Sequence, residues 1–228
     1  MKPPDVNADQ SASTFIDNNS TVTFYYRPQD QRARMLFSAV DNRGRENIQC
    51  VPLTSLTAVR DRSILQFFRA SSRDGTFVCW AKLKFIHYER MVLFYSTFVA
   101  LKRQDLKETP EELIDNPAEM QEEEHYGGVI RDSRMLHALR LFECPGSGAF
   151  RLEARPCRGD REEVPVWTAF LTKYLNKADP IFSLEADNVS VIMSGVKPAP
   201  FMFVSEYRLP QTQHGDYVLR FDSRNGEL

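Results

Sequence analysis

The longest apolar stretch of the chain, residues 76–103, limits the fold more than any other segment. It is rich in aromatic and β-branched side chains, which favour pleated strands. A short polar break at Tyr88-Glu89-Arg90 predicts that the stretch folds back on itself as two long antiparallel strands. With this break as the turn, one face of the hairpin carries apolar pairs such as Phe85 with Phe94. We expect that face to lie on the core.

Strand-like segments follow one another along the rest of the chain, and turn residues separate them. Residues 35–40 and 48–53, for example, flank a loop that contains Gly44, which is typical of a hairpin. The same reasoning predicts further strands at residues 21–26, 63–70, 128–131, 136–143, 149–156, 181–186, 189–193, 201–207 and 217–222.

Residues 163–177 are predicted to form the one main helix. The apolar side chains of Val164, Trp167, Leu171 and Tyr174 recur at spacings of three and four, which is typical of an amphipathic helix. We expect Trp167, at the centre of this face, to be buried under the sheet.

Successive antiparallel strands followed by an amphipathic helix centred on Trp167 resemble the element order of pleckstrin-homology-like folds. This resemblance implies a mainly β, α+β fold whose antiparallel sheets form a barrel or a sandwich. It transfers no binding residues to this chain. The strands after residue 180 exceed one such domain, so they either begin a second copy or return to the first sheet.

The 228 residues suffice for one large β domain or for two small ones. Residues 1–20, rich in Asp, Asn and Ser, are predicted to be a disordered tail. Residues 21–228 are predicted to be globular, either as one region or as two modules, 21–104 and 125–228. A strongly acidic loop, 105–124, would join these modules, and a loop of that length is typically disordered or functional.

The sequence contains no recognisable catalytic or metal-binding pattern. None of the 4 cysteines lies close enough to another for a CxxC pair, and the Gly-x-Ser-x-Gly and phosphate-loop motifs are absent. Cys79, inside the apolar stretch, is expected to be buried. Arginines beside Cys157 would lower the pKa of its thiol, but no base accompanies it. The sequence therefore predicts no cofactor, no metal and no enzymatic activity.

Charge and hydropathy also bear on location. The formal net charge of −2 provides no overall field that would draw the protein to DNA or to an acidic membrane. The N-terminal residues lack the apolar region of a secretory signal. The apolar run at residues 91–101 is shorter than the ~20 residues that a transmembrane helix needs. We expect no transmembrane segment and a cytoplasmic or nuclear location.

The first candidate surface is the outer face of the predicted hairpin. It carries Trp80, Lys82 and Lys84 beside Tyr95. Cations interleaved with aromatic rings suit single-stranded nucleic acid, because bases stack on the rings and phosphates pair with the cations. The plainer alternative is that the lysine stems cover an aromatic sheet while their charges remain in water.

The second candidate surface is rich in arginine and consists of Arg151, Arg155, Arg158 and Arg161. Such a cluster suits phosphate or the carboxylates of a partner. It equally suits the acidic loop of the same chain. We favour this intramolecular pairing, because the nearly neutral total charge implies that the basic and acidic blocks offset each other.

These observations favour a non-catalytic protein-interaction module or an adaptor subunit of a larger intracellular assembly, with a protein as its partner. Single-stranded nucleic-acid binding is the second hypothesis. An enzyme whose site forms only in the tertiary structure is the third. The sequence does not indicate an oligomeric state.

Overall fold

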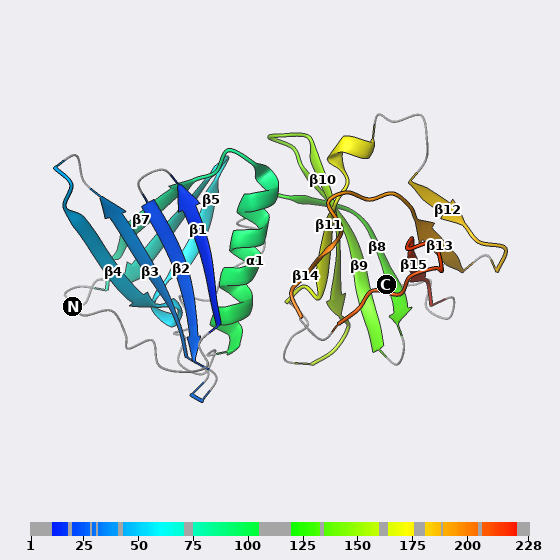
Figure 1. Ribbon diagram of the computed structural model, residues 1–228, viewed down its shortest axis with the longest axis horizontal. Coiled ribbons are helices and arrows are strands. Elements are labelled where there is room, and N and C mark those ends of the chain that lie inside the picture. The colour runs from blue at the N-terminus through cyan, green and yellow to red at the C-terminus, as the bar shows by residue number, and fades with distance from the viewer. Residues whose placement is uncertain are drawn as a thin grey trace. The chain divides into compact units, whose positions relative to one another are not determined.

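The chain divides into two compact units, residues 1–120 and residues 121–228. Strands dominate both units, and the first also contains one long helix, α1 (Tyr88–Gln104), as Figure 1 shows. The computed structural model describes residues 11–17, 20–27, 29–30, 32–40, 43–70, 75–104, 120–132, 135–159, 164–175, 181–187, 189–204 and 207–222.

In the part that the structure describes, the first unit contains two antiparallel sheets and α1. One sheet has the strand order β1-β2-β3-β4 and the other has the order β5-β6-β7. Each strand pairs with its neighbour in sequence, so both sheets are built from hairpins. The bounds are β1 Ser11–Asp17, β2 Ser20–Arg27, β3 Arg32–Val40, β4 Glu46–Pro52, β5 Thr57–Asp61, β6 Ile64–Ala70 and β7 Phe77–Lys84, with the short 3-10 helix η1 at Leu53–Ser55.

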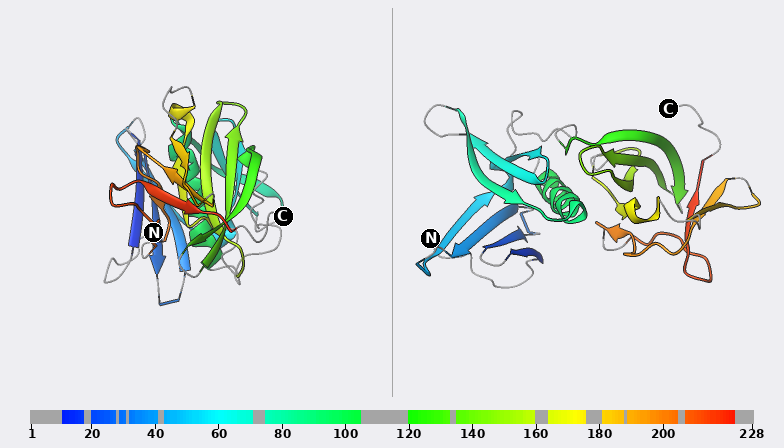
Figure 2. Two further views of the ribbon diagram at one scale, coloured as in Figure 1. Left: turned by 90° about the vertical axis from the view of Figure 1, so that its right-hand side faces the viewer. Right: turned by 90° about the horizontal axis from the view of Figure 1, so that it is seen from above.

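Helix α1 packs aromatic side chains against both sheets. The ring of Phe94 lies 4.9 Å from that of Phe24 on β2 and 5.9 Å from that of Phe67 on β6. The ring of Phe98 lies 5.3 Å from that of Phe67. All four side chains are buried. The right-hand view of Figure 2 shows the blue and cyan sheets as two layers with α1 beside them, and this aromatic cluster joins the three parts.

The prediction of two antiparallel strands over residues 76–103 is correct for β7 and wrong for its second half. Residues Tyr88–Gln104 are helical, and Met91, Tyr95 and Phe98 are buried at spacings of three and four. The polar break contains no Gly, Asn, Asp or Pro, the residues that favour a tight hairpin turn. The aromatic and β-branched composition pointed to strands, but the helical spacing decides the structure.

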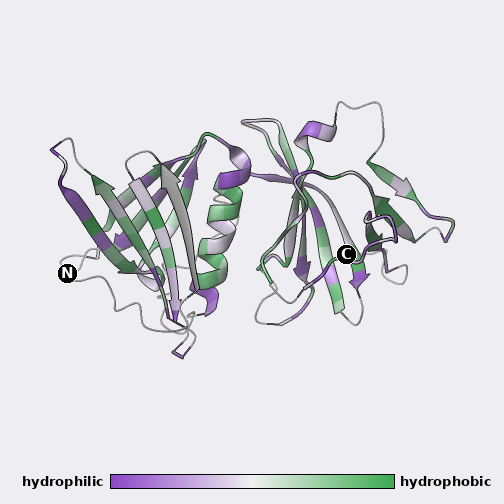
Figure 3. Cartoon of the chain, in the orientation of Figure 1, coloured by the Kyte–Doolittle hydropathy of each residue, from purple (hydrophilic) through white to green (hydrophobic). Residues whose placement is uncertain are grey.

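The ends of α1 carry charges that suit its dipole. Glu89 lies in the first turn, and Lys102 and Arg103 lie in the last turn. Figure 3 shows the helix green along its middle and purple at both ends. The buried Lys102 also donates a hydrogen bond of 2.5 Å to the carbonyl oxygen of Leu56, which ties the end of the helix to the start of the second sheet.

The prediction that residues 1–20 form a disordered tail is wrong for its second half. Residues Ser11–Asp17 form β1, which pairs along its whole length with β2. Polar composition suggested disorder, but pairing with a neighbouring strand satisfies the backbone of this segment. Residues 1–10 lie outside the described residues.

The second unit also contains two antiparallel sheets. The larger has the order β14-β11-β10-β9-β8 and the smaller has the order β12-β13-β15. The part of this unit that the structure describes contains no α-helix. The bounds are β8 Glu123–Asp132, β9 Met135–Cys144, β10 Ala149–Pro156, β11 Trp167–Phe170, β12 Phe182–Leu184, β13 Ser190–Met193, β14 Phe201–Met202 and β15 Tyr217–Arg220, with the 3-10 helix η5 at Thr172–Tyr174.

Strand β8 begins inside the segment that was predicted to be an acidic loop, 105–124. Glu123 and Glu124 pair with Glu143 and Phe142 of β9, so the end of the predicted loop is a strand. The remainder of that prediction, residues 105–119, lies outside the described residues.

The predicted helix at residues 163–177 is wrong at its centre. Residues Trp167–Phe170 form β11, which lies between β10 and β14, and all four side chains are buried. A strand buried on both faces loses the alternation of polar and apolar residues, so its pattern can imitate a helix. The hydroxyl of Thr168 donates a 3.0 Å hydrogen bond to the carbonyl oxygen of Leu152. The predicted burial of Trp167 is confirmed, since its side chain is 0% exposed.

The mainly β, antiparallel character of the prediction is confirmed in both units. The predicted strands at residues 35–40 and 48–53 are β3 and β4, joined around Gly44, whose φ is +74°. Glycine adopts this left-handed conformation without a steric penalty. Among the described residues, no helix has the length and apolar character needed to cross a membrane.

Candidate functional site

Two lysines from the first candidate surface, Lys82 and Lys84, lie on β7. Their register partners on β6 are Gln66 and Ile64, which flank the fully buried Leu65. Successive residues of a strand project to opposite faces. The two lysines therefore lie on the outer face of the β5-β6-β7 sheet, and both are exposed.

Trp80 lies at a β-bulge in the pairing of β7 with β6. Phe67 lies opposite Ala81, and the next residue, Phe68, lies opposite Cys79, so Trp80 is the extra residue. A bulge bends the strand and re-aims the side chain that it carries. Trp80 is half-buried. Because of the bulge, its place two residues before Lys82 does not by itself put it on the same face as the two lysines.

Tyr95 does not belong to this surface. It lies on α1 and is only 9% exposed, so its assignment to the same face as Lys82 and Lys84 is wrong. That assignment depended on the second strand of a hairpin that does not form. Trp80 is the one aromatic residue of the predicted set that stays on β7, whereas stacking of successive bases uses several rings.

The first half of β7 and the loop after the strand expose apolar side chains. Phe77 is 50% exposed, Val78 is 48% exposed and Ile86 is 91% exposed. Cys79 is also exposed, which corrects the prediction that it is buried. Because three consecutive residues of a strand point to alternate faces, both faces of this half of β7 are accessible.

The charge on β6 and β7 has one sign. The two strands contain Arg69, Lys82 and Lys84 and no Asp or Glu, and all three cations are exposed. Lys82 and Lys84 therefore give the outer face positive charge beside the exposed Phe77, and Asp61 of β5, the register partner of Ile64, adds one exposed carboxylate to that face. It is the part of the first unit with the clearest chemical preference, namely for an acidic and partly apolar partner.

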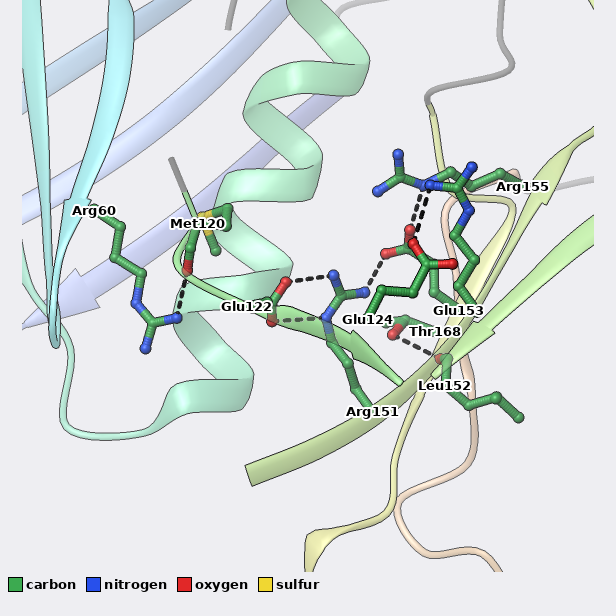
Figure 4. A network of polar contacts seen from close by, with 10 residues as sticks. Arg60, Met120, Glu122, Glu124, Arg151, Leu152, Glu153, Arg155 and Thr168 are labelled. Carbon is green, nitrogen blue, oxygen red and sulfur yellow. Dashed lines mark hydrogen bonds and ion pairs between the residues drawn. The ribbon is translucent and has the colours of Figure 1, made fainter. Parts of the chain in front are cut away.

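Arg151, from the second candidate surface, is buried in a network of ion pairs in the second unit (Figure 4). Its Nε and Nη2 donate hydrogen bonds of 2.9 and 2.6 Å to the two carboxylate oxygens of Glu122. Its Nη1 donates to Glu153. The guanidinium carbon lies 4.3 Å from the ring centroid of Phe142. The donor fork is thus occupied by internal carboxylates and does not offer a site for phosphate.

Glu153 accepts hydrogen bonds from both Arg151 and Arg155. Burial by itself raises the pKa of Glu153, but the charges of these two arginines outweigh it and hold the pKa below its ordinary value. Arg158 is exposed, and Arg161 lies outside the described residues. Arg151 and Arg155 therefore serve the interior of the unit, whereas Arg158 faces solvent.

Contacts between the arginines and the predicted acidic segment occur at the end of that segment. Glu122 binds Arg151, and an oxygen of Glu124 lies 3.5 Å from a guanidinium nitrogen of Arg140. Binding of residues 105–119 to the arginines remains a prediction, since those residues lie outside the described ones.

A further arginine holds the last described residue of the first unit. Nη1 of Arg60 donates a 2.6 Å hydrogen bond to the carbonyl oxygen of Met120, as Figure 4 shows. The same guanidinium lies 5.7 Å from the ring centroid of Tyr88 on α1. Met120 is 4% exposed, so this contact anchors a buried chain segment and is structural.

A buried polar cluster in the second unit was missed by the sequence analysis. His137 of β9 is 1% exposed, and its ring centroid lies 5.6 Å from that of Tyr207. Both His137 nitrogens lack a hydrogen-bond partner among the described residues. Burial raises the pKa of Tyr207, and a side-chain hydrogen bond with Asp132 raises it further. Burial lowers the pKa of His137, and the charge of Asp132 offsets part of this effect. The sequence held one signal for this burial. His137 lies two residues before the buried Leu139 on one strand, and residues two apart project to the same face.

Cys157 departs from its prediction as well. Burial is the largest influence and raises the pKa of the thiol, while Arg158 and Arg140 offset part of the rise. The arginines thus act in the predicted direction, but the prediction of a lowered pKa is wrong because burial outweighs them. Within the described ranges, no group of three or more His, Cys, Asp or Glu residues is arranged to hold a metal ion.

The sequence matches two family models, each described as a PH domain found in tandem in fungal proteins. One covers residues 10–122 and the other covers residues 123–226. These limits lie two residues from the division between the structural units at 120 and 121. The β-rich, pleckstrin-homology-like fold class is confirmed. Searches of curated proteins and of solved structures found no match.

Proposed function

We propose that this chain, which belongs to the family of fungal proteins with PH domains in tandem, is a non-catalytic interaction protein that binds a protein partner. PH domains in tandem are typically protein- or lipid-interaction modules, so the proposal agrees with the family. An adaptor role within a larger assembly, in the cytoplasm or nucleus, is part of the same proposal. The binding surface is the outer face and free edge of β7.

The observation that carries this proposal is the exposure of β7. Phe77 and Val78 are about half exposed, and Lys82 and Lys84 project from the same strand. Exposed apolar side chains next to exposed positive charge are typical of a surface that a partner covers. The apolar part supplies affinity, and the charges supply orientation and rate of association.

A protein suits this surface better than nucleic acid does. The predicted aromatic platform has lost Tyr95, which is buried on α1. Trp80 remains, but it is half-buried at a bulge. Two lysines beside a single recessed ring support fewer stacking contacts than the binding of successive bases requires.

The test is recovery of partners from cells that express the tagged full chain. We compare the wild type with Lys82→Glu/Lys84→Glu and with a control, Arg158→Glu/Lys173→Glu, which reverses two exposed charges in the second unit. The proposal predicts a protein that co-purifies stoichiometrically with the wild type and the control and is lost from the β7 variant. A partner retained equally by all three chains would contradict the assignment to β7.

Nuclease treatment separates the two classes of partner. Recovery of the partner should survive it. If the lysine-dependent material is instead nucleic acid, and its binding falls steeply as salt rises, the protein-partner proposal is wrong.

A further inference from the structure

Strand β7 forms one edge of its sheet. Along one side it pairs with β6 over its full length, and among the described residues no strand pairs with its other side. In an antiparallel ladder, the backbone N–H and C=O groups of alternate residues point away from the existing partner. An edge of this kind is a template for one more strand.

The first half of this edge has no side chains that block it. Phe77, Val78 and Cys79 are consecutive and exposed, so an incoming strand can approach from either face. Proteins usually protect such edges with charge, proline or covering segments. The second half of β7 carries such charges at Lys82 and Lys84.

These charges determine which strand the edge accepts. Pairing with the β7 edge of a second copy would join two cationic strands, since β6 and β7 contain Arg69, Lys82 and Lys84 and no carboxylate. That arrangement is repulsive. An acidic strand would place its carboxylates beside Lys82 and Lys84 instead. The same residues thus disfavour self-association and favour an acidic partner, which is how specificity commonly arises.

We propose that β7 binds an extended acidic segment of its protein partner by strand addition, so that the partner forms a fourth strand of the β5-β6-β7 sheet. This inference rests on the proposed function and specifies its mode. Backbone hydrogen bonds along β7 provide the register. Apolar side chains of the partner cover Phe77 and Val78, and its acidic side chains lie against Lys82 and Lys84.

The test uses a fluorescein-labelled peptide of about ten residues that alternates valine and glutamate, a length typical of a strand. A matched peptide carries N-methyl groups on every second backbone nitrogen, which removes hydrogen-bond donors and leaves the side chains. Fluorescence anisotropy measures binding of both peptides to the full chain. Hydrogen exchange measures protection of the β7 amides.

Strand addition predicts saturable binding of the first peptide with new protection within Phe77–Lys84. N-methylation and Lys82→Glu/Lys84→Glu should each weaken binding on the order of tenfold or more, about 1.4 kcal/mol per factor of ten. The Arg158→Glu/Lys173→Glu control should bind like the wild type. Affinity should also fall as salt rises, because exposed charges are screened over about 8 Å at physiological ionic strength.

Three results would overturn the inference. The first is equal affinity for the methylated peptide, which indicates side-chain docking without backbone pairing. The second is no saturable binding at about 100 µM peptide. The third is displacement of the peptide by a labelled oligothymidine whose own binding requires Lys82 and Lys84. If a cellular partner requires the lysines but does not protect the β7 amides, the proposed function stands and strand addition is wrong.

Discussion

The Arg151 side chain connects two carboxylates inside the second unit, so its replacement should destabilise that unit strongly. The side chains of Arg151, Glu122 and Glu153 are 5%, 4% and 1% exposed. Arg151→Met preserves the apolar stem and the contact with Phe142 but leaves both carboxylates without this partner. Breaking a buried ion pair by removing one member costs about 3–5 kcal/mol. Arg155 still binds Glu153, so we expect a value near the lower end.

Chemical denaturation monitored by tryptophan fluorescence can assign this loss to one unit. The chain has 2 tryptophans, Trp80 in the first unit and Trp167 in the second. In a Trp80→Phe background, Trp167 reports the second unit alone. This separation matters because a chain of two units need not unfold in one step. The exposed Arg158→Met is the matched control, and it should change the free energy of unfolding by less than about 0.5 kcal/mol.

The same ion-pair network should make the free energy of unfolding depend on pH in the acid range. Because the arginines lower the folded-state pKa of Glu153, this residue contributes stability at pH values above the ordinary pKa of glutamate, 4.5. That contribution is lost as the pH falls through the folded-state pKa. Without Arg151, the loss should begin at a higher pH. A destabilisation of Arg151→Met below about 1 kcal/mol, or an unchanged acid profile, would refute the assignment of Arg151 to a stabilising network.

Three further predictions concern the second unit and the acidic segment. Trp167→Ala should cost about 3–5 kcal/mol in denaturation, because it empties a fully buried site; a loss below about 1 kcal/mol would contradict the burial. Burial lowers the pKa of His137, so the unfolded state binds more protons, and stability should fall as the pH drops below the ordinary value of 6.5. His137→Gln should flatten this pH dependence, and an unaltered slope would exclude His137 as its source. Deleting residues 109–119 should delay elution from heparin, because it removes the predicted acidic partner of the arginines, of which Arg158 is exposed; unchanged elution would contradict that pairing.

Local sequence information was sufficient for most of the strands. The pairs β3–β4, β8–β9 and β9–β10 are hairpins of neighbouring segments, and their alternating residues and turn residues lie within a few positions of each other. The position of Gly44 is local in the same sense. These features predict a mainly β, antiparallel chain because each depends on interactions over a short stretch.

Tertiary packing decided the elements that were predicted wrongly. Met91, Tyr95 and Phe98 already had helical spacing, but their β-prone neighbours concealed it until packing between two sheets selected the helix. The spacing around Trp167 imitated that of a helix because all four side chains of β11 are buried, and that burial comes from tertiary packing.

For the two candidate surfaces as well, sequence determined one part and tertiary structure the other. Composition located Lys82 and Lys84 on a strand, but only the sheet order places that strand at an edge, where no strand among the described residues pairs with its other side. The arginines were visible as a group, yet the burial of Arg151 depends on Glu122, which lies 29 residues away in sequence. Sequence alone determined which residue types were available for binding. The tertiary structure decided which of them face solvent, because burial depends on contacts between residues far apart in the chain.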